Sequence, residues 1–246
     1  MPTDEPRERV VLVTGANGGL AAAIMPELAR AGYRLVLTDL ADCTAAAAAL
    51  GDAVILRQSC DLESPAELGG FLERAAQAAE IDSVLNNAAC MGLCPVEQLS
   101  PDVMRRFNRI NVEAPLQIAQ HLASGMRRRG FGRIVNIVSG TPWFPSPGMS
   151  AYLTSKMGLI GLTRALAHEF GGDGITVNAI TPALTRHANN QDGLPDEVWT
   201  SVPMLQAIKR PGRPHDIAAG ILFLMSEGAG FMTGQTLAMD GGMVLR

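Results

Sequence analysis

The sequence predicts an α/β fold: one domain with a doubly wound parallel sheet of seven strands and helices on both faces. Short apolar runs rich in β-branched residues alternate with longer helical stretches, and strands separated by helices are typical of right-handed parallel crossovers. The strand runs are apolar throughout, which indicates that both faces of the sheet are buried. The 246 residues suit one such domain, and the 47% of hydrophobic residues supply a sizeable core.

The strands and the helices between them follow from local signals along the chain. Gly32 closes the first helix, because glycine often terminates helices. Ser64 and Ser100, each followed by proline, open two later helices, since serine caps a helix N-terminus and proline fits its first turn. The expected strands are residues 10–14, 34–39, 53–59, 83–88, 133–139, 175–181 and 235–240. The first helix is expected to end near residue 30. Three further helices are expected, one around 45–50, one over 150–170 and one that starts near 215.

One segment, residues 187–214, lacks a regular pattern and is rich in glycine, proline, asparagine and aspartate. Long irregular segments inside a compact domain are usually functional. The sequence therefore predicts a substrate lid over a pocket in this segment. Nothing resembling a repeat or a linker divides the chain, so residues 1–246 are expected to form a single domain.

The composition argues against several other classes of protein. The formal net charge is −4, whereas proteins that bind nucleic acid usually carry a basic stripe. The arginine run at 127–129 suits a helix C-terminus. We expect no membrane partner, because no segment is long and apolar enough to span a bilayer. The N-terminus lacks the apolar stretch of a signal peptide, so a cytoplasmic location is expected.

The four cysteines are Cys43, Cys60, Cys90 and Cys94, and they are expected to be reduced thiols. Cys90 and Cys94 have neither a second cysteine pair nor a nearby histidine to complete a zinc site. The sequence therefore predicts no metal.

Gly15, Gly18 and Gly19 lie between the first strand and the first helix. They let the backbone turn tightly and approach a ligand, and the helix N-terminus suits a pyrophosphate. Asp39 ends the second strand about 20 residues further on, where a carboxylate accepts both ribose hydroxyls of an adenosine and repels a 2′-phosphate. Because Gly18 and Leu40 offer no cation for such a phosphate, the sequence favours NAD over NADP as the cofactor.

Further motifs stand in register along nearly the whole chain. They are TGANGGL at 14–20, CDL at 60–62, NNAA at 86–89, Asn111, Ser139, YLTSK at 152–156 and TGQTLAMDGG at 233–242. In this combination the chain resembles the short-chain dehydrogenases/reductases. The resemblance implies a Rossmann-type fold, an NAD(P)-dependent oxidoreductase and usually a homotetramer. The part from Ile175 onward is most similar to NAD-dependent secondary-alcohol dehydrogenases such as 1-phenylethanol dehydrogenase.

The resemblance also implies a set of cofactor contacts. Asp61 and Leu62 would lie by the adenine, and Asn87 by the adenosine ribose. The expected cofactor-binding residues are Gly15, Asn17, Gly18, Gly19, Leu20, Asp39, Asp61, Leu62, Asn87, Ala88, Tyr152, Lys156, Pro182 and Thr185.

The chain departs from the family pattern at four positions. Ala21, Ala89 and Ala183 stand where the family has glycine. His187 stands where the family has a threonine near the nicotinamide carboxamide, with Thr185 close by.

Tyr152 and Lys156 lie one helical turn apart, after the fifth strand. A free phenol, with a pKa near ~10, is a poor base at neutral pH, but a neighbouring ammonium favours the phenolate. Tyr152 is therefore expected to move the proton, while Lys156 tunes it and holds the nicotinamide ribose. Ser139 is expected to orient the substrate oxygen, and Asn111 to anchor a water that links Lys156 to solvent.

Pro115 follows Asn111 by four residues inside a predicted helix. A proline there has no N–H to donate to the Asn111 carbonyl. Two interpretations stay open: the carbonyl is left free to bind a water, or the proline only kinks the helix.

The expected reaction interconverts an apolar or aryl secondary alcohol and its ketone, with NAD. The expected substrate pocket is mostly apolar, as such sites usually are, and comprises Cys90, Trp143, Phe144, Trp199 and Met204, with Met91, Leu93 and Leu205 nearby. An alternative is a reductase of 3-oxoacyl thioesters on acyl carrier protein, which commonly uses NADPH and a basic docking patch. Another is a dinucleotide-sensing protein without activity, which predicts loss of the tyrosine or the lysine.

Overall fold

The computed structural model describes residues 8–187 and 195–245. Its strands form a seven-stranded parallel sheet, which confirms the predicted doubly wound architecture. The strands are β1 (Val10–Thr14), β2 (Arg34–Asp39), β3 (Val54–Ser59), β4 (Ser83–Asn86), β5 (Gly132–Ile137), β6 (Ile175–Pro182) and β7 (Thr236–Met239). Their order in the sheet is β3-β2-β1-β4-β5-β6-β7, so the chain reverses direction across the sheet between β1 and β4, where such folds bind ligands.

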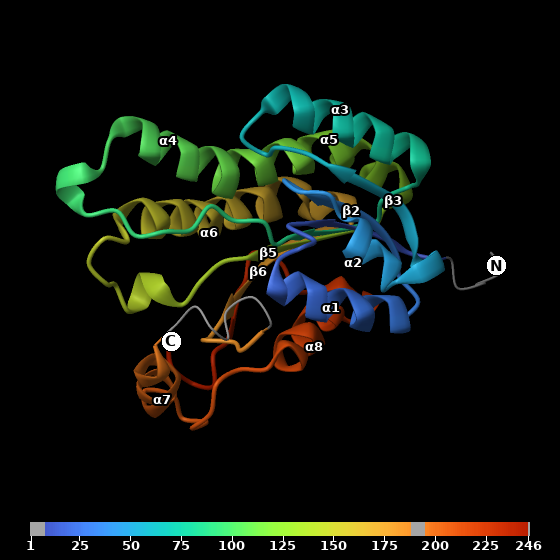
Figure 1. The fold of residues 1–246 in the computed structure, drawn as a ribbon. Coiled ribbons are helices and arrows are strands. Elements are labelled where there is room, and N and C mark those ends of the chain that lie inside the picture. The colour runs from blue at the N-terminus through green and yellow to red at the C-terminus, as the bar shows by residue number, and fades with distance from the viewer. Residues whose placement is uncertain (1–7, 188–194, 246) are drawn as a thin grey trace.

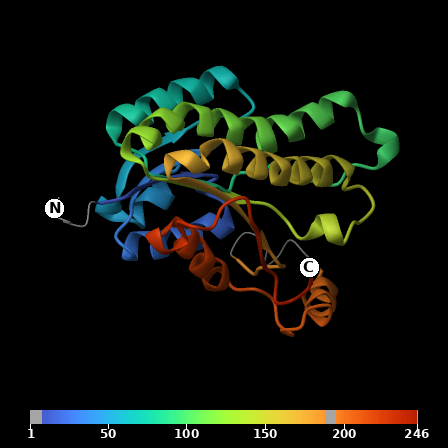
Figure 2. The same ribbon diagram turned by 180° about the vertical axis from the view of Figure 1, so that it is seen from behind.

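Helices cover both faces of this sheet (Figures 1 and 2). The helices are α1 (Gly19–Arg30), α2 (Thr44–Ala48), α3 (Pro65–Ala78), α4 (Pro101–Asn108), α5 (Ala114–Arg129), α6 (Ser150–Phe170), α7 (Asp196–Met204) and α8 (Pro214–Met225). The apolar faces of α3, α5 and α6 pack on one side of the sheet, and those of α1 and α8 pack on the other.

The two cores follow from the alternation of side chains along each strand. In β1, Leu12 belongs to the core under α3 and α5, whereas Val11 and Val13 belong to the core under α1 and α8. Successive residues of a strand point to opposite faces, so a strand covered on both sides must be apolar at every position. This is why the continuous apolar runs predicted the covered sheet correctly.

The helix boundaries confirm the capping signals. The hydroxyl oxygen of Ser64 accepts a hydrogen bond from the Glu67 amide, and that of Ser100 accepts one from the Val103 amide. Gly32 follows the end of α1 with a φ of 86°, a conformation that favours glycine.

Three details differ from the predicted elements. The strands expected over 83–88 and 133–139 end at Asn86 and Ile137, so Asn87 and Ser139 lie on loops at the carboxyl edge of the sheet. The helix expected around 45–50 is observed as α2, Thr44–Ala48, which ends two residues earlier.

The helix expected from Ser100 is divided. A π-helical segment, Arg109–Glu113, separates α4 from α5, and Pro115 lies in the first turn of α5. Asn108, Glu113 and Ala114 keep helical backbone angles, so the proline, which has no N–H to donate, interrupts the hydrogen bonding of a continuous helical stretch. The irregularity thus lies just before the proline, and the water on the Asn111 carbonyl stays a prediction.

The prediction that residues 187–214 are irregular was wrong for α7. Asp196 and Glu197 lie in its first turn, where acidic side chains complement the helix dipole. Proline and glycine on either side obscured this signal. Residues 188–194 lie outside the described residues, and the role of the segment as a lid stays a prediction.

Candidate active site

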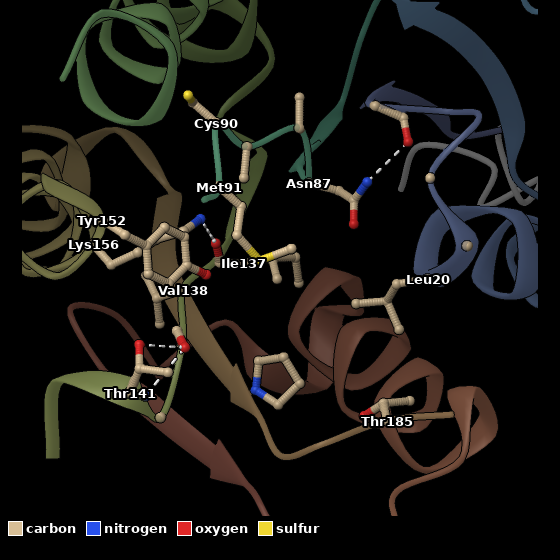
Figure 3. Close-up of a pocket in the computed structure, with 18 of the residues that line it drawn as sticks. Leu20, Asn87, Cys90, Met91, Ile137, Val138, Thr141, Tyr152, Lys156 and Thr185 are labelled. Atoms are coloured by element: carbon tan, nitrogen blue, oxygen red, sulfur yellow. Dashed lines mark hydrogen bonds between the residues drawn. The ribbon is translucent and has the colours of Figure 1, made fainter. Parts of the chain in front are cut away.

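A cavity of about 1260 Å³ lies at the carboxyl edge of the sheet. Its walls come from the loops that follow the strands and from the first turns of α1 and α6. Figure 3 shows Tyr152, Lys156 and Thr141 on one side of this cavity, with Leu20 and Asn87 on the other. The loops after β2 and β3 form one end, and those after β5, β6 and β7 form the other.

The turn between β1 and α1 is held against the loop after β4. Gly15 has a φ of 67°, and a Cβ added there would lie 2.8 Å from the Cα of Ala88. The side-chain amide of Asn87 donates to the carbonyls of Thr14 and Gly15, at 3.1 and 3.0 Å. In return, the Thr14 hydroxyl oxygen accepts hydrogen bonds from the amides of Asn87 and Ala88, both at 3.1 Å. Only glycine at position 15 permits this contact.

The N-terminus of α1 is open to a ligand. Gly18 occupies the N-cap position without a side-chain hydrogen bond, and the first turn contains no acidic residue. Gly18, Gly19 and Leu20 line the cavity. Unpaired amides and a positive helix end without a compensating carboxylate fit the pyrophosphate of a dinucleotide.

Asp39 lies at the end of β2 and lines the same cavity. Its carboxylate accepts hydrogen bonds from the amide of Asn17, at 2.9 Å, and from that of Ala41, at 3.3 Å. The cationic side chains among the described lining residues are Arg106 and Lys156, neither of which belongs to the segment after β2. The end of the cavity beside Asp39 therefore presents a carboxylate and, among the described lining residues of the segment after β2, no cation.

Tyr152 lies in the first turn of α6 and is buried, with 7% of its surface exposed. Burial raises the pKa of its phenol, and a hydrogen bond with Ser139 partly offsets that rise. The Ser139 hydroxyl is itself held, because its oxygen accepts the Thr141 amide at 3.1 Å and lies 2.8 Å from the Thr141 hydroxyl. The two hydroxyl groups thus face the same part of the cavity.

Lys156 is buried, and its ammonium donates to the carbonyl of Ile137 at 2.8 Å. It lies 5.8 Å from the centre of the Tyr152 ring. Burial lowers the pKa of Lys156 to about 8. The lysine is therefore fixed between β5 and the tyrosine.

Asn111 lies behind the cavity wall, in the π-helical segment. Its side-chain oxygen accepts the Cys90 amide at 2.7 Å, and its nitrogen donates to the Cys90 carbonyl at 2.9 Å and the Ser155 hydroxyl at 2.8 Å. The Ser155 hydroxyl donates to the carbonyl of Tyr152. Asn111 thus ties the loop after β4 to the first turn of α6, and its role in binding a water stays a prediction.

The structure brings most of the predicted site residues to one cavity. Those on its wall are Gly15, Gly18, Gly19, Leu20, Asp39, Asp61, Leu62, Asn87, Ala88, Cys90, Ser139, Phe144, Tyr152, Lys156, Pro182 and Thr185. Met91 and Leu205 also line it. The predicted residues away from the wall are Asn17, Asn111, Trp143, Trp199, Met204 and Leu93.

Neither tryptophan is among the residues that line the cavity. Trp143 packs beside the core formed by Val138, Leu159 and their neighbours. Trp199 is buried under the guanidinium of Arg186, which lies 4.4 Å from its ring centre. Met204 is exposed to solvent. Val202 on α7 and Leu205 at its C-terminal end line the cavity instead.

Several lining residues were missed by the sequence analysis. Arg106 and Ile110 are four residues apart on the helical stretch that leads to Asn111, so the helical period could have placed both on one face. Met149 and Met243 line the cavity from irregular segments, for which the sequence carries no signal of direction.

The family model described as enoyl-(acyl carrier protein) reductase matches residues 15–244. The chain belongs to the short-chain dehydrogenase/reductase family. It is therefore an oxidoreductase of a family that uses a nicotinamide cofactor.

Two curated relatives are similar to this dehydrogenase/reductase over nearly its full length. An acetoacetyl-CoA reductase from Shinella zoogloeoides is 34% identical, over 95% of this chain and 98% of the relative. The 2-(S)-hydroxypropyl-CoM dehydrogenase 3 of Xanthobacter autotrophicus is 30% identical, over 96% of this chain and 97% of the relative.

A solved structure extends the comparison to three dimensions. The 3-oxoacyl (acyl-carrier-protein) reductase from Agrobacterium tumefaciens, with NADP bound, superposes with a TM-score of 0.86 at 29% identity. The match covers 96% of this dehydrogenase/reductase and 94% of that chain.

Two other kinds of feature are absent from the described residues. None of their helices has the length and apolar character needed to cross a bilayer. They contain no group of three or more His, Cys, Asp or Glu side chains arranged to hold a metal ion.

Proposed function

We propose that this protein is an NAD-dependent oxidoreductase that interconverts an apolar or aryl secondary alcohol and its ketone. One observation carries the proposal: the hydroxyls of Tyr152 and Ser139 face a cavity whose substrate end is mostly apolar, while Asp39 lies at the opposite end. The apolar residues at the substrate end are Phe144, Met149, Leu184, Val202, Leu205 and Met243. A pocket of this kind selects by shape, with few polar contacts.

The chain's own residues supply the proton chemistry. In alcohol oxidation, the phenolate of Tyr152 takes the hydroxyl proton while Ser139 holds the oxygen by a hydrogen bond. In ketone reduction, the protonated Tyr152 donates to the same oxygen. The positive charge of Lys156 favours the phenolate. A bound nicotinamide accepts or supplies the hydride.

The residues at the other end support NAD as the cofactor. Asp39 would accept the ribose hydroxyls, Asp61 and Leu62 would lie by the adenine, and Asn87 would support the adenosine ribose. The carboxylate of Asp39 would repel a 2′-phosphate. The related reductase with NADP bound is the reason to test both cofactors.

A 3-oxoacyl-thioester reductase is the second candidate. Support comes from the likeness to an acetoacetyl-CoA reductase and to a 3-oxoacyl (acyl-carrier-protein) reductase. The same Tyr152 and Ser139 would act on the 3-oxo group. Asp39 argues against NADPH, and a net charge of −4 gives no support to a basic docking patch.

A substrate panel separates the two candidates. The purified protein is assayed with acetophenone, 1-phenylethanol, acetoacetyl-CoA and a charged 2-hydroxy acid, each with NAD(H) and NADP(H). The proposal expects the highest kcat/KM with the aryl pair and NAD(H). A far higher kcat/KM for acetoacetyl-CoA would establish the second candidate, and a preference for the charged hydroxy acid would contradict the apolar pocket.

A further inference from the structure

His187 lies against the turn that follows β1, although it belongs to the segment that follows β6. A Cβ added to Gly19 would lie 2.2 Å from Nδ1 of His187, 2.8 Å from its Cγ and 3.0 Å from its Cε1. The imidazole therefore occupies the space that any side chain at position 19 would take. Both residues line the cavity.

That space is the one through which a pyrophosphate reaches the backbone. In dinucleotide-binding turns, the glycine at the helix start lacks a side chain so that the backbone can approach the pyrophosphate. Here Gly19 is the first residue of α1, and no side chain caps that helix or neutralises its first turn. A dinucleotide bound at this helix end must contact the imidazole or displace it.

The two cationic side chains on the described wall, Arg106 and Lys156, each have a partner within the protein. The Lys156 ammonium donates to the Ile137 carbonyl, and Arg106 forms an ion pair with Glu63, with 3.0 Å between Nε and Oε2. Burial lowers the pKa of His187, so at neutral pH its ring is uncharged and carries a single N–H donor.

We propose that His187 donates a hydrogen bond to the cofactor pyrophosphate, which is then held between the N-terminus of α1 and the segment after β6. This inference rests on the proposed dinucleotide-dependent function. The proposed contact of His187 is with the phosphates and not with the nicotinamide. NADH and ADP-ribose both contain the phosphates, whereas only NADH contains the nicotinamide. His187 would thereby fasten the start of the 187–214 segment to the bound cofactor.

Binding of two ligands to the purified protein tests this directly. Dissociation constants for NADH and for ADP-ribose are measured by calorimetry, without substrate, for the wild type, His187→Ala and His187→Gln. His215→Ala is the matched control, because that histidine is exposed, with its Nδ1 3.7 Å from Glu27. Loss of a hydrogen bond to a charged group corresponds to about tenfold weaker binding. The alanine variant is expected to lose about tenfold for both ligands, and glutamine, which retains a donor, is expected to lose less.

Other outcomes overturn the inference. Weaker binding of NADH alone would assign His187 to the nicotinamide, and tighter binding of both ligands would show that the ring obstructs the site. Unchanged dissociation constants in both His187 variants would show that His187 has no role in binding. If the wild type and His215→Ala bind neither ligand, the dinucleotide-dependent function itself fails. Thermal unfolding of each variant identifies a loss that comes from misfolding.

Discussion

Tyr152 and Lys156 are both buried, and burial moves their pKa values in opposite directions. The phenol pKa is raised and the ammonium pKa is lowered to about 8, because a low-dielectric environment disfavours the charged form of each group. The raised pKa keeps Tyr152 protonated at neutral pH, which is the form that ketone reduction needs, but it also makes the phenol a weaker acid. Formation of the phenolate needs the charge on Lys156 and a cationic nicotinamide beside it.

Replacement of Tyr152 by phenylalanine removes the hydroxyl and keeps the ring. We expect kcat to fall at least about 100-fold in both directions, since general acid/base groups contribute factors of this size or more. NADH binding is expected to be nearly unchanged, because the ring still packs with Phe107 and Ala151. Steady-state kinetics and calorimetric titration measure the two effects. Substantial turnover by the variant would show that another group carries the proton.

The two pKa shifts also predict how rate depends on pH. Ketone reduction needs the protonated phenol and the charged lysine, so its kcat should stay level through neutral pH and fall above about pH 8 as Lys156 loses its proton. Alcohol oxidation needs the phenolate and the charged lysine, so its rate should rise from neutral pH and fall above about pH 8 as Lys156 loses its proton. Profiles with saturating cofactor in both directions measure this. An oxidation rate that declines from neutral pH upward would contradict the assignment.

Asp39 is expected to set the cofactor preference. Asp39→Ala removes the carboxylate that would repel a 2′-phosphate, so the ratio of kcat/KM for NAD to that for NADP should narrow by about tenfold or more. The carboxylate also accepts the amides of Asn17 and Ala41, so Asp39→Asn, which keeps an acceptor, is the control for disruption of the turn. Wild-type preference for NADP would refute the assignment.

At the scale of elements, the C-terminal end of α7 offers a matched pair. Leu205 lines the cavity and Met204 does not, although both side chains are mostly exposed. A bulky substrate should cover Leu205, so Leu205→Ala is expected to raise KM for aryl ketones by about fivefold, as partial loss of apolar burial predicts. Met204→Ala should leave KM unchanged. Equal effects of the two substitutions would show that Leu205 does not contact the substrate.

Sequence patterns determined some elements of the site better than others. The positions of Tyr152 and Lys156 were predictable because residues four apart lie on the same face of a helix. The position of Ser139 was predictable because it follows a buried strand. The directions of Trp143 and Trp199 were not predictable. The direction of a side chain next to a loop depends on its tertiary neighbours, which are the core of Val138 and Leu159 for Trp143 and the guanidinium of Arg186 for Trp199. The helix α7 was hidden for a similar reason, because its flanks resemble loop sequence.

At the scale of the whole molecule, the sheet was predicted from sequence because its strands are covered on both faces. The sequence indicated an irregularity at Pro115 but could not show that it would take the form of a π-helical segment, Arg109–Glu113. Nor could it show that Asn111 would tie the loop after β4 to Ser155. The hydrogen bonds of Asn111 join residues far apart in the chain, which local sequence patterns do not reveal.

Assembly of the molecule remains a prediction. We expect a homotetramer with two-fold symmetry, with the α4–α5 and α6 helices forming one interface. Phe231 is fully exposed and Phe223 on α8 is partly exposed, so apolar surface is also available near β7. Light scattering at micromolar concentration should give the mass of four chains. A monomer under those conditions would contradict the expectation.

The loop after β4 has a thermodynamic consequence. Thr14 and Asn111 together accept the amides of Asn87, Ala88 and Cys90, so this loop is ordered by contacts with β1 and the π-helical segment. Its conformational entropy is therefore lost when the chain folds, and a cofactor that binds later does not have to order it. The free energy of binding at this wall can then appear as affinity instead of being consumed in organising the loop.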